Sequence, residues 1–139
     1  MKRTLLNAKI HRATVTEAHL HYEGSISLDP ELIRAAGLFE FERVDIYNCT
    51  NGERFSTYVI VGGPGEVCLN GAAARKAQPG DTVIIANYAE CEQAECAAHR
   101  PKLVFVDSEN GIREVKRPSA RAFSADAPEA ADESFSVLV

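Results

Sequence analysis

The sequence predicts a small, mainly β fold with one or two short helices, and its many strands favour a barrel. Short apolar segments rich in β-branched residues recur along the chain, and turns containing Gly, Asn or Pro separate them. The 139 residues suit one domain. We expect a single β-barrel domain over residues 1–117 and a mobile tail over residues 118–139, where Ala, Ser, Pro, Asp and Glu dominate.

The expected strands share apolar residues, partial alternation with polar ones, and flanking turn residues. They cover residues 2–11, 13–22, 43–49, 54–61, 66–70, 82–88, 102–106 and 112–116. Asn51-Gly52 favours a hairpin between the third and fourth of them, because both residues tolerate positive φ. The fifth strand is expected to end in a Gly-Ala turn over residues 71–74.

Helices are expected at two places. Asp29 can cap the exposed N–H groups of the first helix, Pro30 suits its first position, and Gly37 suits its end. Residues 90–99 are rich in Ala, Glu and Cys and fit either a short helix or a loop.

Composition excludes several classes of protein. The formal net charge is −5, which argues against a general nucleic-acid binder, because such a protein presents a basic face to phosphates. No apolar run approaches the ~18 residues needed to span a bilayer. The first residues lack the long apolar core of a secretory signal, so we expect a cytoplasmic protein without nucleic-acid or membrane partners.

The sequence predicts no metal and no disulfide. None of the four cysteines forms a CxxC pair, and a chain without a secretory segment is not expected to oxidise them. His19 and His21 share one face of an expected strand, but no third ligand stands at a suitable spacing.

Gly24-Ser25 is the dipeptide that carries chemistry. Such a pair is common in ordinary turns, but a serine hydroxyl can attack the preceding carbonyl when the backbone is held strained, which glycine permits. An N→O acyl shift then gives an ester, and elimination from that ester splits the chain. Hydrolysis leaves a pyruvoyl group, a ketone that can form a Schiff base and act as an electron sink.

Three motifs in order make the chain recognisable: HYEGS at 21–25, NGERFSTY at 51–58 and NGAAA at 70–74. Together they resemble the pyruvoyl-dependent aspartate 1-decarboxylases. That resemblance implies a double-psi β-barrel, a homotetramer, and conversion of L-aspartate to β-alanine and CO2 for pantothenate and coenzyme A synthesis. It also implies a pyruvoyl group derived from Ser25, with neither metal nor pyridoxal phosphate.

The resemblance further implies roles for individual residues. Self-cleavage falls between Gly24 and Ser25, Thr57 assists it by hydrogen-bonding the Gly24 carbonyl, and Tyr58 donates a proton to the carbanion-like intermediate. The remaining implied residues lie at the substrate or cleavage site. They are Arg54, which holds a substrate carboxylate, Lys9, His11, Tyr22, Asn70, Gly71, Ala72 and Ala73.

These residue types suit the implied chemistry. The planar guanidinium of Arg54 can grip one carboxylate of aspartate through two hydrogen bonds, while the other carboxylate leaves as CO2. A positioned phenol can then protonate carbon. Strict alternation puts Arg54 and Tyr58 on one strand face and Thr57 on the other, so a bulge or twist is expected if Thr57 and Tyr58 serve one site.

Two alternatives remain open at this point. The chain could be a double-psi barrel used only for binding or assembly, with Gly24-Ser25 an ordinary turn. It could also be a pyruvoyl decarboxylase that acts on another amino acid, although Arg54 favours a substrate with an extra carboxylate.

Overall fold

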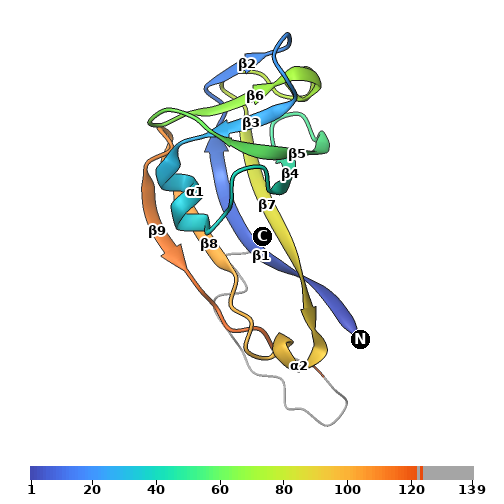
Figure 1. Ribbon diagram of the computed structural model, residues 1–139. Helices are drawn as coiled ribbons and strands as arrows, with labels where there is room; N and C mark the ends of the chain where they lie inside the picture. The colour runs from blue at the N-terminus through green and yellow to red at the C-terminus, as the bar shows by residue number, and fades with distance from the viewer. Residues whose placement is uncertain (122, 124–139) are drawn as a thin grey trace.

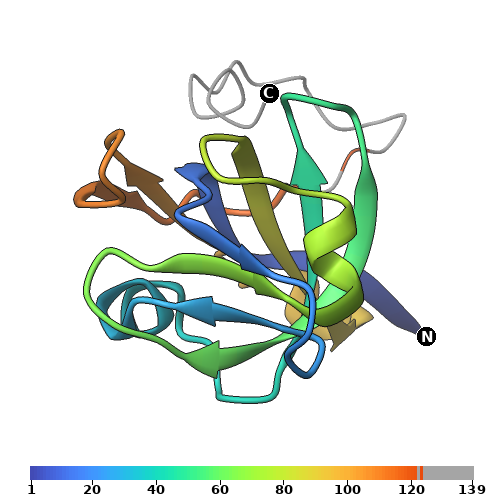
Figure 2. The same ribbon diagram turned by 90° about the horizontal axis from the view of Figure 1, so that it is seen from above.

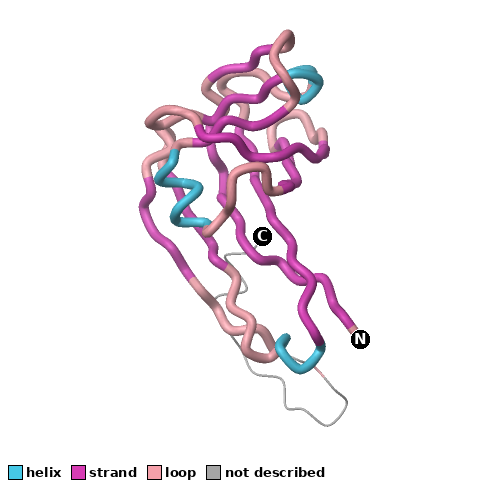
Figure 3. Tube along the Cα trace, in the orientation of Figure 1, coloured by secondary structure: helices cyan, strands magenta, loops and turns pink. Residues whose placement is uncertain are grey.

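The computed structural model describes residues 1–121 and 123 (Figure 1). Strands dominate this part of the chain, and its helices are short and peripheral (Figure 3). The strands are β1 (Lys2–Thr14), β2 (Glu17–His19), β3 (Ser25–Leu28), β4 (Arg43–Asn48), β5 (Arg54–Val61), β6 (Val67–Asn70), β7 (Thr82–Glu92), β8 (Lys102–Val106) and β9 (Ile112–Lys116). The helices are α1 (Pro30–Ala36), the 3-10 helix η1 (Gly71–Arg75) and α2 (Gln93–Cys96).

The strands form one sheet in the order β2-β6-β3-β5-β4-β7-β1-β8-β9. Three pairs, β1–β8, β2–β6 and β3–β5, are parallel although the other ladders are antiparallel. The sheet curls around a common interior when viewed from above (Figure 2). The predicted mainly β fold is therefore confirmed, and the arrangement is consistent with a double-psi barrel.

The core is built from alternating apolar side chains on the inner face of the sheet. Ile10, Ile26, Ile46 and Ile85 are at most 2% exposed, and they come from β1, β3, β4 and β7 respectively. All four residues of β3 are buried, because β5 and β6 pair with its two edges. The strand that begins at Ser25 is thus held rigidly in the middle of one half of the sheet.

The first helix begins and ends where the sequence predicted. The Asp29 side chain accepts a hydrogen bond from the Glu31 N–H at 2.8 Å, and Pro30 is the first helical residue. Gly37 ends the helix in the left-handed conformation, with φ of 68°. The hairpin between β4 and β5 is also confirmed, but only Gly52 of the Asn51-Gly52 pair adopts positive φ.

Several predicted boundaries were wrong. The break predicted near residue 12 is an irregularity inside one long strand, where Arg12 adopts φ of 60° and the pairing with β7 shifts register. Of the strand predicted over 13–22, residues 13 and 14 belong to the end of β1, and only Glu17–His19 form a separate strand, β2. The strand predicted over 82–88 is β7, which continues to Glu92. The turn predicted at 71–74 is the 3-10 helix η1.

The beginning of the predicted tail packs on the barrel domain. The Ala120 N–H donates to the His99 carbonyl at 3.1 Å, and Arg100 donates to the Arg117 carbonyl. Residue 122 and residues 124–139, on which most of the tail prediction falls, lie outside the described residues. No described helix combines the length and apolar character needed to cross a membrane.

Candidate active site

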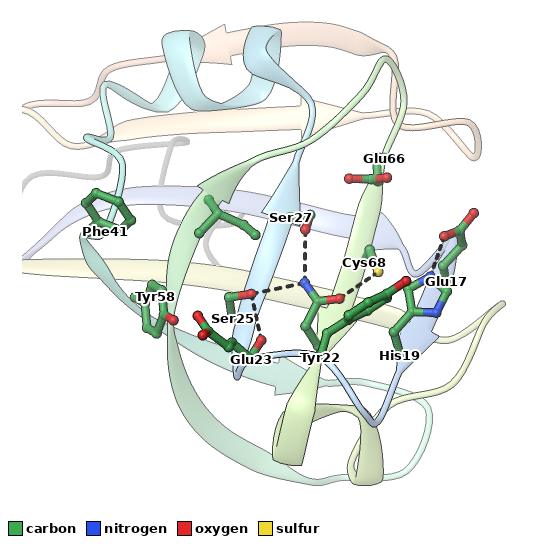
Figure 4. A pocket seen from close by; sticks show the side chains of 12 residues that line it. Glu17, His19, Tyr22, Glu23, Ser25, Ser27, Phe41, Tyr58, Glu66 and Cys68 are labelled. Carbon is green, nitrogen blue, oxygen red and sulfur yellow. Dashed lines mark hydrogen bonds and ion pairs between the residues drawn. The ribbon is translucent and has the colours of Figure 1, made fainter.

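Ser25 lies in a cavity of about 510 Å³ at the end of the molecule formed by β2, β3, β5 and β6 (Figure 4). The residues that line this cavity come from several short segments that are distant in sequence. They are Glu17, His19, Tyr22, Glu23, Ser25, Ser27, Phe41, Tyr58, Ile60, Glu66, Cys68 and Asn70. Four of the predicted site residues, Tyr22, Ser25, Tyr58 and Asn70, are therefore brought together.

Strand pairing explains this convergence. Ser25 is directly opposite Asn70 in the antiparallel β3–β6 ladder. On its other edge β3 runs parallel to β5, where Ile26 is opposite Val59, so the preceding residues Ser25 and Tyr58 are also neighbours. Ser25 is thus flanked by a carboxamide on one side and a phenol on the other.

The Asn70 side chain organises the cavity floor. Its Nδ2 donates to Ser25 Oγ at 3.0 Å and to Ser27 Oγ at 2.9 Å, and its Oδ1 accepts from the Cys68 thiol at 3.4 Å. Asn70 is 4% exposed, so this carboxamide satisfies its donors and its acceptor inside the protein. Its orientation is consequently fixed.

The Ser25 hydroxyl is held at the peptide that the sequence marks for cleavage. While Oγ accepts from Asn70, it donates to the Glu23 carbonyl oxygen at 3.2 Å. Ser25 is 2% exposed, whereas Gly24 before it is exposed. The Ser25 hydroxyl is therefore buried and hydrogen-bonded, and the adjacent peptide is at the surface.

Gly71, rather than Gly24, has the demanding backbone. Gly71 adopts φ of 66°, and a Cβ at this position would lie 2.6 Å from both N and Cα of Gly24. Gly24 has no positive φ, and the nearest atom to a Cβ there would be the Asn70 carbonyl oxygen at 4.0 Å. The close approach of Gly71 to Gly24, at the predicted cleavage site, therefore depends on the missing side chain of Gly71.

Thr57 does not line the cavity. The β4–β5 register runs without a shift from Arg54 to Tyr58, so the expected bulge is absent from this ladder and Thr57 faces away from Tyr58. Extending the β3–β5 register back by two residues sets Thr57 beside Gly24. Thr57 is thus beside Gly24 and Tyr58 beside Ser25, on opposite faces of the strand. No hydrogen bond joins Thr57 to Gly24 within the described part of the chain.

Arg54 lies apart from the cavity. Its guanidinium carbon is 4.1 Å from the centre of the Tyr47 ring, and its side chain points to solvent. Arg54 is four residues before Tyr58 on the same strand, which separates their backbones by roughly 13 Å. Within one chain, Arg54 therefore does not lie beside Ser25.

Lys9 and His11 also lie outside the cavity. Lys9 is 7% exposed, and burial lowers its pKa, although the nearby Cys49 acts in the opposite direction. His11 packs on Phe105 at 5.4 Å between ring centres, in a second hollow that Arg12 also lines. Burial, followed by the charges of Lys9 and Arg12, lowers the pKa of His11 and favours its neutral form.

Ala72 and Ala73 belong to η1, immediately after the corner formed by Asn70 and Gly71. Neither lines the cavity. Ala72 is exposed, and Ala73 packs partly against the core. Their position beside Asn70 is compatible with a loop that shapes the cleavage site.

Comparison with known proteins identifies the family. Residues 1–113 match the family model for aspartate decarboxylase. The chain belongs to the aspartate decarboxylase family. A relative from Hydrogenobaculum sp., named aspartate 1-decarboxylase, is 60% identical over 124 residues, which cover 89% of this chain and 99% of that protein.

Two further relatives carry the same name. The protein of Bdellovibrio bacteriovorus is 57% identical over 117 residues, covering 84% of this chain and 94% of its own length. The protein of Bordetella avium is 54% identical over 119 residues, covering 84% of this chain and 98% of its own length. The family match thus takes in the barrel and the whole Ser25 cavity.

Sequence reasoning missed part of the lining of this aspartate decarboxylase cavity, notably Ser27, Glu66 and Cys68. Alternation could have found two of them, since Ser27 shares a strand face with Ser25 and Cys68 shares one with Asn70. Glu66 precedes its strand, and only the folded arrangement brings it to the cavity.

The described lining carries three glutamates and neither Lys nor Arg. Burial, followed by the charges of Glu66 and Glu17, raises the pKa of the Cys68 thiol to about 11. The thiol therefore keeps its proton near neutral pH and can donate to Asn70. A dicarboxylate substrate entering this cavity needs a cation from elsewhere.

Proposed function

We propose that this chain is a self-processing, pyruvoyl-dependent decarboxylase that converts L-aspartate to β-alanine and CO2 as a cytoplasmic homotetramer. Its product would supply pantothenate and coenzyme A synthesis. The observation that carries the proposal is the buried Ser25 hydroxyl, hydrogen-bonded to Asn70 and Glu23 at the Gly24–Ser25 peptide, in a member of the aspartate decarboxylase family.

Processing would begin with Ser25 Oγ. This oxygen attacks the Gly24 carbonyl carbon, and transfer of the acyl group from nitrogen to oxygen gives an ester. Elimination removes the Cα proton of Ser25 and breaks its Cβ–Oγ bond, which releases a chain ending in the Gly24 carboxylate and leaves dehydroalanine. The imine tautomer of dehydroalanine then adds water and loses ammonia. Residues 25–139 would then begin with a ketone, which supplies an electron sink for loss of CO2 from an amine substrate.

The surrounding side chains fit a ketone at this position. Asn70 Nδ2 supplies a hydrogen-bond donor beside Ser25, and Gly71 leaves room next to Gly24. The Tyr58 phenol faces the same cavity and would donate the proton to carbon after CO2 has left. Tyr22 forms part of the rim, where it is 66% exposed.

Assembly would complete the substrate site. Phe41 lines the cavity yet is 70% exposed, and Phe39 nearby is 81% exposed, which gives a second copy an apolar surface to cover. Arg54 is exposed, so its guanidinium can reach the cavity of a neighbouring copy and hold one carboxylate of aspartate. Lys9 would add a cationic group and His11 a polar group to the same side of the substrate site.

Intact-mass measurement tests the processing step. We expect two chains, residues 1–24 and 25–139, with the larger one lighter by one ammonia than a fragment that begins with serine. Ser25→Ala should give one uncleaved chain that keeps its β-sheet circular dichroism and makes no β-alanine. Ser27→Ala is the matched control, because Ser27 also accepts a hydrogen bond from Asn70 but does not follow the Gly24 carbonyl that is attacked.

Two results would contradict the proposal. One is a single uncleaved mass in a preparation that makes β-alanine, and the other is β-alanine formation by Ser25→Ala. A purely binding or assembly barrel would give one intact chain that does not react with hydroxylamine, a reagent for ketones. A substrate screen separates aspartate from other amino acids.

A further inference from the structure

Glu17, His19 and Cys68 form a compact group on the wall of the Ser25 cavity (Figure 4). One ligand atom from each residue lies within 4.8 Å of the other two. The group arises from the parallel β2–β6 pairing, which sets Glu17 opposite Cys68 and His19 opposite Asn70. Sequence spacing gave no third ligand for His19, because Cys68 comes from a strand far along the chain.

We propose that Glu17, His19 and Cys68 bind a thiophilic divalent cation of the zinc or cobalt class. Thiolate, imidazole and carboxylate are the three ligand types that zinc takes in proteins. Three such ligands leave a fourth position for water.

The geometry requires only small movements. Tetrahedral zinc with ordinary bond lengths separates its ligand atoms by about 3.5 Å. His19 Nε2 now lies 2.7 Å from Glu17 Oε2, and the cation would separate this pair and bring both atoms towards Cys68 Sγ. The Glu17 and His19 side chains are 56% and 42% exposed, so they can adjust, whereas Cys68 is buried and fixed.

Charge also favours a cation at this group. When the metal binds, the Cys68 thiol releases its proton to solvent and sulfur becomes a thiolate, while His19 binds through a neutral nitrogen. The thiolate and the Glu17 carboxylate together neutralise a divalent ion. No Lys or Arg is among the described residues of this chain that line the cavity, so the chain itself places no cation there to oppose binding.

The position of the group connects it to Ser25. The Cys68 thiol donates to Asn70 Oδ1, and Asn70 Nδ2 donates to Ser25 Oγ. A metal-bound thiolate has no proton to donate, so binding removes one of the contacts that orient Asn70. A bound cation would therefore slow cleavage at Gly24–Ser25, a consequence that rests on the proposed function.

Cobalt titration of the full, chelator-treated chain tests the site directly. We expect one Co²⁺ per chain with a thiolate-to-cobalt charge-transfer band, which added Zn²⁺ abolishes. The band should disappear in Cys68→Ser, and Glu17→Gln should weaken cobalt binding at least tenfold. Glu17 is exposed, so its variant tests the site without disturbing the core.

Matched controls are available nearby. Cys49→Ser removes an exposed thiol, and His21→Ala removes an exposed imidazole of the same segment, so both should leave the band unchanged. A missing band in the wild type, or an unchanged band in Cys68→Ser, would overturn the site. Zn²⁺ should slow cleavage of fresh precursor in wild type but not in Glu17→Gln. Unchanged cleavage alongside a cobalt band would overturn only the connection to Ser25.

Discussion

The Ser25 cavity and the surface that carries Arg54 differ in what one chain completes. At the cavity, Ser25, Asn70, Gly71 and Tyr58 meet through β3, β5 and β6 of the same molecule. Arg54 instead stacks on Tyr47, and its backbone lies roughly 13 Å along the strand from that of Tyr58. The lining of the cavity is acidic. We infer that self-cleavage uses one chain, whereas substrate binding needs a cation brought by assembly.

Tyr58→Phe should give the largest separation of these two functions. The change removes only the phenolic oxygen, so cleavage should proceed and yield the two chains. Loss of the proton donor should reduce β-alanine formation by roughly 10²- to 10⁴-fold. Tyr47→Phe is the control, because its hydroxyl bonds Tyr88 outside the cavity. Full activity in Tyr58→Phe would remove Tyr58 from the proposed chemistry.

Arg54→Ala should affect turnover and not cleavage. A hydrogen bond to a charged group contributes about 1.5–3 kcal/mol, so we expect kcat/KM for aspartate to fall roughly tenfold to a hundredfold. Arg3→Ala is the control, since Arg3 is also an exposed arginine of the sheet and does not line the Ser25 cavity. Equal loss in both variants would mean that general charge, rather than a specific grip, attracts the substrate.

Gly71→Ala should destabilise the Ser25 cavity, which one chain builds alone. Its Cβ would meet Gly24 at 2.6 Å and the Tyr22 carbonyl oxygen at 2.8 Å, in a residue with φ of 66°. Such strain costs roughly 1–3 kcal/mol, measurable by denaturant unfolding when every variant also carries Ser25→Ala and stays uncleaved. Gly63→Ala, which meets no atom within 4 Å, should leave stability nearly unchanged. A Gly71→Ala protein as stable as the control would show that the backbone around Gly24 moves aside at little cost in free energy.

Local signals in the sequence predicted the elements that local chemistry determines. The ends of α1 are set by Asp29, Pro30 and Gly37, because each satisfies a backbone requirement at its own position. The irregularity at Arg12 was interpreted as a break, whereas β7 pairs with β1 on both sides of it and keeps the strand continuous. Likewise, the family resemblance predicted that Ser25 and Asn70 belong to one site. No local pattern indicated how far Arg54 lies from them, since that distance depends on the fold.

Thr57→Val should produce the smallest effect. Valine keeps the shape of threonine without its hydroxyl, and one neutral hydrogen bond contributes about 0.5–1.5 kcal/mol, so cleavage should slow about twofold to twelvefold. Intact-mass time courses measure this rate, and Thr57→Ser should restore it. Thr57 faces away from Tyr58, so the variant isolates the Gly24 side of the scissile peptide from the cavity side. An unchanged rate would leave Ser25, Asn70 and Gly71 as the cleavage apparatus and place Thr57 with the residues that only support the strand.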